Sequence, residues 1–472
     1  MNGGINFSKN CVKDGALGIE QDLMAIYRAG VERVDSYQML IEHVQKLDQN
    51  LEIQFEGQNL KLDLRNYEKI YVVGVGKASA RMGRAMENIL GERLTGGIVS
   101  TKYGHCEPLK KIKIIEAGHP LPDENSLLSG EEINALARTF DDKTLVINLI
   151  SGGGSALLEI PSSFEDNGKS VQLSLEDLRQ TTQVLLACGA TINEINCIRK
   201  HLSAIKGGQL VRMIQPAHSI NLILSDVVGD RLDAIASGLT VGDETTFADG
   251  LEVIERYGIR SKLPEVVYKA LQLGADRVIR ETPKPGDAIF NTTVNLLIGT
   301  NSTAVQAASN KARQLGYRTM LLPSPVVGEA RQAATMLFKT AKDLRQQQEN
   351  AAETSTCILA GGETTVTLRG YGKGGRNQEM ALSFLCEMEK EQDDCEGIYF
   401  LAASTDGSDG PTDAAGAFAS PELIQKANEL KLDPVSFLRN NDSYHFFEKV
   451  GGLFKTGPTK TNVCDIQILI IR

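Results

Sequence analysis

Apolar positions along the first half of the chain follow two different periods. Between residues 20 and 49 they recur at helical spacing, so we predict helices there, with Leu23, Ile26, Tyr27, Val34, Leu40, Ile41 and Val44 as inward positions. Further along, short apolar runs end in glycine or polar residues, which is typical of buried strands; they cover residues 71–73, 97–100, 145–150 and 220–224. Because helical stretches separate them, the pattern predicts a Rossmann-like, three-layer α/β domain with a mostly parallel sheet over residues 15–240.

The same alternation returns after a more polar stretch. Residues 241–285 contain Pro264, Pro283 and Pro285 and indicate a helical connector that ends in a linker. Beyond it we predict a second, smaller α/β domain over residues 286–472. Its expected strands cover residues 294–298, 317–322, 357–360, 366–368, 399–403 and 465–471.

Composition and charge exclude several classes of protein. A hydrophobic fraction of 42% and a charged fraction of 23% are typical of a folded globular chain. The net charge of −10 argues against a general nucleic-acid binder, and no apolar stretch approaches the ~20 residues that span a bilayer. The eight cysteines form no C-x-x-C pair, so we expect reduced packing residues in a cytoplasmic protein. The sequence leaves open whether the chain forms a homo-oligomer.

Two glycine-rich loops follow strands of the first predicted domain. Gly74, Gly76 and Lys77 follow one strand, and Ser151, Gly152, Gly153, Gly154 and Ser155 follow another. Backbone N–H groups in such turns form a concave anion site, although a single glycine loop is more often only a tight turn. Because two glycine loops follow strands of one predicted sheet, the sequence favours a site for phosphate or carboxylate at the carboxyl edge of that sheet.

These loops fail the familiar nucleotide-binding patterns. Tyr71 and Ala78 stand where a P-loop needs glycine and a hydroxyl residue, so the first loop is not a Walker A motif. A dinucleotide fingerprint would place glycine or alanine at Ser79, and the next strand ends at Lys102 rather than at an acid. The histidines nearest these loops, His119 and His201, are interpreted as structural residues.

The second predicted domain carries a cationic loop. Ahead of a predicted helix, this loop places Lys373 and Arg376 among four glycines, Gly370, Gly372, Gly374 and Gly375. The guanidinium of Arg376 can bind phosphate or carboxylate bidentately. A turn with incidental charge is the competing interpretation. Aspartates also cluster after predicted strands, at Asp226, Asp230, Asp406 and Asp409. Mg²⁺ needs only one or two carboxylates besides substrate phosphates, so these are candidate metal ligands or partners of substrate hydroxyls.

Taken together, the loops resemble the glycerate 2-kinase family whose C-terminal half is the MOFRL domain. The matching stretches occur in family order: GVGKA (74–78), AGHPLPDENS (117–126), LISGGGSALL (149–158), NCIRKHLSAIKGG (196–208), LILSDVVGD (222–230), LAGGETTV (359–366), GKGGRNQE (372–379) and TDGSDGPTDAAGA (405–417). The resemblance implies ATP- and Mg²⁺-dependent phosphorylation of D-glycerate at its 2-hydroxyl, at a site in the cleft between the two domains.

The resemblance also implies residue roles. It assigns catalysis to Lys77 and Arg376, which would stabilise the charge of the transferred phosphoryl group. Gly152–Ser155 would bind an anionic group of substrate or nucleotide, and Glu363 is a further candidate. An NAD(P)H-dependent hydroxypyruvate reductase is the alternative reading. Two positions depart from the family pattern: Leu239 replaces a turn proline, and Lys460 replaces a glycine, which would strain the loop or add charge to the pocket.

Overall fold

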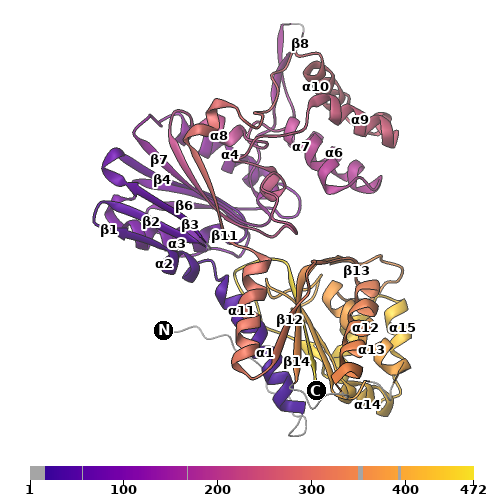
Figure 1. The fold of residues 1–472 in the computed structure, drawn as a ribbon. Helices are drawn as coiled ribbons and strands as arrows, with labels where there is room; N and C mark the ends of the chain where they lie inside the picture. Colours follow the sequence, from indigo (N-terminus) through magenta and orange to yellow (C-terminus); the bar gives the residue numbers. More distant parts are fainter. Residues whose placement is uncertain (1–15, 56, 167, 349–354, 392–394) are drawn as a thin grey trace. The chain divides into compact units, whose positions relative to one another are not determined.

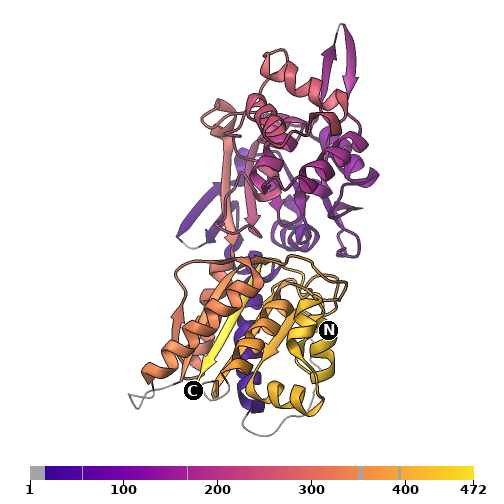
Figure 2. The same cartoon turned by 90° about the vertical axis from the view of Figure 1, so that its right-hand side faces the viewer.

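The structure is a computed structural model that describes residues 16–55, 57–166, 168–348, 355–391 and 395–472 (Figures 1 and 2). The chain divides into two compact units. The N-terminal unit comprises Ser36–Ile298, and the C-terminal unit comprises Gly299–Arg472 together with the described residues up to Asp35. This division differs from the boundaries expected at residues 240 and 285. Residue 15, the expected start of the first domain, lies outside the described residues.

A six-stranded sheet forms the centre of the N-terminal unit. Its strand order is β11 (Thr293–Gly299), β10 (His218–Leu224), β7 (Thr144–Ile150), β4 (Lys69–Val75), β5 (Gly96–Lys102) and β6 (Ile112–Ala117). Every pair from β10 to β6 is parallel, which confirms the predicted mostly parallel sheet.

The side chains of β4 show how helices come to cover both faces of this sheet (Figure 1). Val73 and Val75 share a core with Ile133 of α4 (Glu124–Ala137), and α8 (Gln209–Ile214) packs on the same side. Gly74 points the other way, where an added Cβ would meet Val99 and Ser79 at the start of α3 (Ser79–Leu90). Because successive strand residues face opposite sides, this alternation buries β4 from Val72 to Val75 and fixes where its following loop emerges.

The residues expected to form a connector belong instead to a helical layer of the N-terminal unit. Here α9 (Phe247–Tyr257) and α10 (Glu265–Ala275) share a core with α6 (Leu175–Ala187) and α7 (Ile192–His201) through Leu178, Ile198, Ile254 and Leu271. Ser174 and Asp177 form a capping box at the start of α6. The hairpin of β8 (Ser163–Asp166) and β9 (Lys169–Gln172) adds Phe164 to the same core.

Two predictions for the N-terminal unit were wrong. The helices predicted up to residue 49 end at α2 (Gln38–His43), because an antiparallel sheet of β1 (Val44–Leu47), β2 (Asn50–Phe55) and β3 (Gln58–Asp63) follows. The strand at 294–298, which we assigned to the second domain, is β11 of the first sheet. Buried amides bind it there: Asn148 Nδ2 donates to Asn221 Oδ1 at 2.6 Å, and Asn221 Nδ2 donates to Asn295 Oδ1 at 2.8 Å.

The C-terminal unit is a second three-layer arrangement. Its sheet has the order β12 (Arg318–Leu321), β14 (Thr356–Thr365), β18 (Asp465–Ile471), β15 (Ile398–Ser404), β16 (Gly416–Ala419) and β17 (Leu453–Phe454), with β13 (Val326–Glu329) also paired to β14. The pairs from β14 to β17 are antiparallel. Strand β14 runs unbroken through Gly361 and Gly362, and the separate strand predicted at 366–368 is absent.

Helices cover both faces of this second sheet (Figure 1). On one face α1 (Ala16–Arg33) packs against α11 (Asn301–Gln314), so a helix from the start of the chain completes the C-terminal unit. On the other face α12 (Ala330–Gln348) packs against α13 (Arg376–Lys390). The shorter helices α14 (Pro421–Glu429), α15 (Pro434–Arg439) and α16 (Ser443–Val450) contact α13. Among the described residues, no helix combines the length and apolarity needed to cross a bilayer.

Candidate active site

The two glycine loops of the N-terminal unit are bound to each other at the carboxyl ends of β4 and β7. Lys77 N donates to Gly152 O at 2.9 Å, and Ala78 N donates to Ser151 Oγ at 3.0 Å. Ser79 Oγ donates to Gly76 O and Ser100 O at the start of α3, so the hydroxyl that breaks the dinucleotide pattern closes the turn. The loops therefore form one structure, as their positions after neighbouring strands predict.

Glycine is required in the second loop because charged and aromatic side chains approach its backbone closely. Gly153 has φ +82°, and an added Cβ would lie 2.8 Å from His119 Cδ2 and 3.6 Å from Lys77 Cε. An added Cβ at Gly152 would collide with the carboxylate of Asp226. The structure thus brings Lys77, Asp226 and the ring of His119 to one glycine turn. His119, interpreted from the sequence as structural, is therefore a further candidate for the site.

A long helix follows only one of the two loops. Helix α3 follows Lys77 and has 12 residues, whereas α5 (Gly154–Leu157) after the second loop has only four. Side chains hold that second loop instead. Ser155 Oγ lies 2.7 Å from Ser237 Oγ, and Arg199 Nη2 donates to Ser155 O at 3.0 Å.

The loop after β10 contains the next two predicted site residues, Asp226 and Asp230. Asp226 is half-buried in the loop that β10 enters, and Asp230 follows in the same loop with φ +53°. Ala236 and Ser237 also have positive φ, at +48° and +57°, where side chains are uncommon. Leu239, which replaces the family's turn proline, is buried in the core beneath. The backbone here is therefore held in conformations that the surrounding contacts must enforce.

Arg376 of the C-terminal unit lies between two carboxylates. Its Nε and Nη2 donate to Asp465 at 2.6 and 2.9 Å, and its Nη1 lies 2.6 Å from Glu363 Oε1. Burial lowers the pKa of Arg376, but Asp465 and then Glu363 outweigh it, so the pKa is raised and the guanidinium stays charged. Asp465 is fully buried, while 30% of the Arg376 side chain and 40% of the Glu363 side chain are exposed. The arrangement holds a fixed, accessible cation.

Asp409 is occupied in starting helix α13. Its Oδ1 accepts from Asn377 N at 3.1 Å, and its Oδ2 accepts from Gln378 N and Gln378 Nε2 at 2.8 and 3.0 Å. Burial raises the pKa of Asp409 to about 6, against these hydrogen bonds, which lower it. A metal ion at this carboxylate would have to displace the N–H donors of the helix that begins at Arg376.

The other predicted residues of this unit lie on neighbouring loops. Asp406 Oδ1 accepts from Ser408 N and Ser404 Oγ, both at 2.9 Å, in the turn after β15. Lys373 Nζ lies 4.2 Å from the ring centroid of Tyr444, which gives it a cation–π contact. Lys460, in place of the family glycine, has φ +63°, so strain is the consequence the structure supports for this departure.

Sequence reasoning missed Asp465 as a site residue. The only local signal is an aspartate that opens the apolar run DIQILII, where a buried acid requires a cationic partner. That partner stands 89 residues earlier in the chain, so the pairing depends on the sheet.

Comparison with known proteins identifies the family. Residues 22–272 match a family described as a domain of unknown function (DUF4147), and residues 356–465 match the MOFRL family. The chain is 39% identical to a glycerate 2-kinase of Pyrococcus horikoshii over 97% of its own length and 98% of that protein. The chain belongs to the glycerate 2-kinase family. A D-glycerate 2-kinase of Thermotoga maritima is also 39% identical, over 86% of this chain and 91% of that protein.

Two solved structures have a similar fold over nearly the whole chain. A glycerate kinase from T. maritima superposes with a TM-score of 0.81 at 35% identity, covering 97% of this chain and all of that one. A P. horikoshii protein gives a TM-score of 0.79 at 38% identity, covering 98% and 99% of the two chains. A relative from Agrobacterium vitis, 42% identical over 85% of this chain and 86% of its own, is provisionally named a hydroxypyruvate reductase.

Proposed function

We propose that the protein transfers the γ-phosphoryl group of ATP to the 2-hydroxyl of D-glycerate and so acts as a glycerate 2-kinase. The main support for this function is that the chain is 39% identical to a glycerate 2-kinase across nearly the whole of both chains. The substrates are small molecules, ATP and D-glycerate. A cytoplasmic location is proposed from the eight cysteines, which form no C-x-x-C pair.

Lys77 and Arg376 are proposed as the catalytic cations. Phosphoryl transfer proceeds with charge spread over the oxygens of the moving group, so fixed positive charges lower its barrier without covalent chemistry. Two observations support the assignment: Lys77 lies at a glycine turn beside β4 and β7, and Arg376 is fixed by Asp465 and Glu363. Gly152, Gly153, Gly154 and Ser155 are proposed to bind an anionic group through backbone N–H donors.

Mg²⁺ is proposed as the metal that accompanies ATP, where it would neutralise charge on the phosphates. The hard carboxylate oxygens of Asp226, Asp230 and Asp406 suit this ion, and Asp226 already lies against the glycine turn. Asp409 fits poorly, because both of its oxygens accept hydrogen bonds from α13. Among the described residues, no group of three or more acidic, histidine or cysteine side chains forms a metal cage.

The test is a coupled assay on the full-length protein. ADP should form only when ATP, Mg²⁺ and D-glycerate are all present, and chelation of the metal should stop it. Separation of the product should give 2-phosphoglycerate. A 3-phosphate would disprove the position of transfer and leave the kinase class intact, whereas no ADP with any three-carbon hydroxy acid would disprove the function.

The name of the A. vitis relative makes NAD(P)H-dependent reduction of hydroxypyruvate the second candidate. Ser79 argues against it, because its side chain fills the turn where a dinucleotide fingerprint has glycine or alanine. The same preparation should therefore leave NADH and NADPH absorbance unchanged with hydroxypyruvate. Loss of that absorbance would establish the reductase reading.

A further inference from the structure

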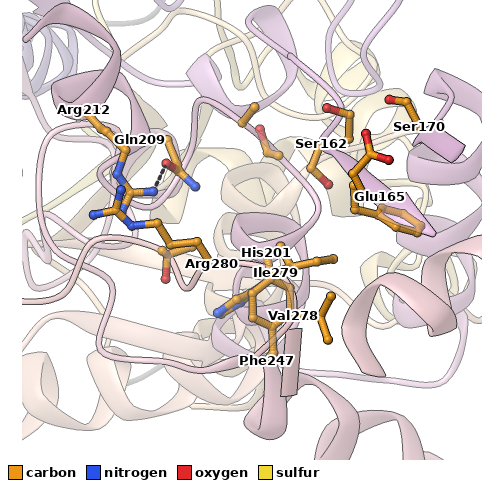
Figure 3. Close-up of a pocket in the computed structure, with 15 residues that line it drawn as sticks. Ser162, Glu165, Ser170, His201, Gln209, Arg212, Phe247, Val278, Ile279 and Arg280 are labelled. Atoms are coloured by element: carbon orange, nitrogen blue, oxygen red, sulfur yellow. Dashed lines mark hydrogen bonds between the residues drawn. The ribbon is translucent and has the colours of Figure 1, made fainter. Parts of the chain in front are cut away.

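A cavity of about 500 Å³ lies in the helical part of the N-terminal unit. Hairpin β8–β9, the end of α7, the start of α8 and the segment after α10 line it. Figure 3 shows Arg212 and Arg280 together at one side, and Glu165 and Ser170 across the pocket from them. None of its lining residues belongs to the loops at 74–77 and 151–155.

The two arginines face the cavity without a negative partner. Arg212 Nη1 donates to Gln209 Oε1 at 2.7 Å and its Nη2 to the backbone oxygen of Glu281 at 3.3 Å, both neutral oxygens, while its buried Nε has no hydrogen-bond partner. Within the described part of the chain, neither Arg212 nor Arg280 forms an ion pair with a carboxylate. Burial lowers the pKa of Arg212, and the positive charge of Arg280 lowers it further.

Two nearby acids, Glu281 and Asp287, are already engaged, and Glu165 lies across the pocket from the arginines. Glu281 binds His201 Nε2 at 3.2 Å, Lys284 Nζ at 2.9 Å and Phe247 N at 3.0 Å. Asp287 raises the pKa of Arg212 from beyond ion-pair distance, and its carboxylate accepts from Lys284 N at 2.9 Å. Two adjacent guanidinium groups that lack a counter-ion in a cavity of this size are what an anion-binding site requires.

We infer that this cavity binds a small phosphorylated metabolite, with its phosphate on Arg212 and Arg280 and its hydroxyl groups toward the serines of the β8–β9 hairpin. Guanidinium groups match phosphate oxygens with paired, charge-assisted hydrogen bonds, and a phosphate here would supply the acceptor that Arg212 Nε lacks. Ser170 and Glu165 at the opposite side can accept or donate to hydroxyls of such a ligand. The site is separate from the proposed catalytic residues, so its occupancy and the kinase reaction can be measured independently.

The experiment is chemical protection of Arg280 in the full-length protein. Phenylglyoxal modifies accessible arginines, and peptide mass mapping gives the modification rate at each position. With glycerol 3-phosphate as the probe, we expect Arg280 to be modified about fivefold or more slowly, and with glycerol alone at the unprotected rate. Arg256 on α9, which pairs with Glu194 and Glu252, is the internal control whose rate should not change.

Replacement of the partner arginine completes the test. In an Arg212→Gln variant the protection of Arg280 by glycerol 3-phosphate should fall at least about threefold, because one of the two charges is gone. Equal modification of Arg280 with and without glycerol 3-phosphate in the unaltered protein would overturn the site, and so would equal protection by glycerol. These two outcomes, with glycerol 3-phosphate and with glycerol, are measured on the unaltered chain. Failure of the Arg212→Gln variant to fold would therefore not obscure them.

Discussion

Asp465 binds Arg376 through both of its carboxylate oxygens, at 2.6 and 2.9 Å, from the first position of the central strand β18. Asp465 is fully buried, while part of the Arg376 side chain remains exposed. A bidentate pair fixes the plane of the guanidinium as well as its position. The sheet therefore orients the cation that we assign to phosphoryl transfer.

Replacing Asp465 with Asn should keep one hydrogen-bond acceptor and remove the charge that orients Arg376. We expect kcat to fall ~10-fold or more, because misplacing a transition-state cation raises the barrier. ATP-dependent glycerate turnover measures it, and thermal unfolding separates this effect from loss of fold. Asp413→Asn is the matched control and should keep near-normal kcat, since the exposed Asp413 pairs with Lys455 and the buried Tyr444 and not with Arg376.

Lys77 and Arg376 should behave as one catalytic unit in a double-mutant cycle. Each single change to Ala should lower kcat by ~10³-fold through loss of charge stabilisation. If both act on the same phosphoryl group, the double variant should lose much less than the product of the two factors. Lys102→Ala, at the end of β5, is the control and should stay within about threefold. Strict multiplication of the two losses would show that the two cations contribute independently and would contradict their action as one unit.

Local patterns predicted the strands well, but not their partners. The runs that form β4, β5, β7 and β10 are apolar enough to be recognised singly, and helices between them dictate parallel pairing. Strand β11 follows a polar, proline-containing stretch, so the sequence assigned it to the next domain, although Asn221 and Asn295 bind it to β10. Likewise, the pattern of α1 predicts a helix without showing that it covers the C-terminal sheet.

The candidate site likewise has features that the local sequence predicts and features that depend on tertiary packing. Lys77 and the glycines follow buried strands directly, so their gathering at one sheet edge could be predicted. The pairing of Asp465 with Arg376 and the approach of His119 to Gly153 depend on tertiary packing. A lone aspartate or histidine in sequence most often has a structural role, and only coordinates distinguish the exceptions.

Gly153→Ala tests the close approach at the second glycine loop. The new methyl group would meet the His119 ring at a position where φ is +82°, so we expect kcat/KM to fall ~100-fold. Gly189→Ala is the matched control, because Gly189 has φ +80° and nothing within 4 Å of the added Cβ. It should cost about 1 kcal/mol of unfolding free energy and leave turnover unchanged. Equal turnover in both variants would argue against a role for this loop.

Lys460→Gly should stabilise the protein. Lysine at φ +63° occupies the left-handed region that glycine enters without steric cost, so relief of this strain should raise the free energy of unfolding by about 0.5–1 kcal/mol. Denaturant unfolding measures the gain. Lys431→Gly, at φ +55° after α14, should gain a similar amount away from the site. A loss of stability at residue 460 alone would show that the lysine side chain makes a compensating contact.

His201 gives the stability of the N-terminal unit a defined pH dependence. Burial alone would lower the pKa of this fully buried imidazole, but its hydrogen bonds to Cys197 and Glu281 and the charge of Asp243 raise it from 6.5 to about 9. A raised folded pKa means that the folded protein binds the proton more tightly. The resulting stability is therefore fully present below about pH 6.5 and is lost as the pH rises through 9.

His201→Gln should accordingly cost most stability near pH 6 and much less near pH 9.5. Urea unfolding of the two proteins at both pH values gives the difference in unfolding free energy. Glu281 has its pKa lowered to about 2, against the effect of burial, by His201 and other donors, so the ion pair is complete at pH 6. In a Glu281→Gln background the pH-dependent part of the His201 effect should shrink, because its main charged partner is removed. A difference that is constant or grows between pH 6 and 9.5 would show that His201 is neutral in the folded protein.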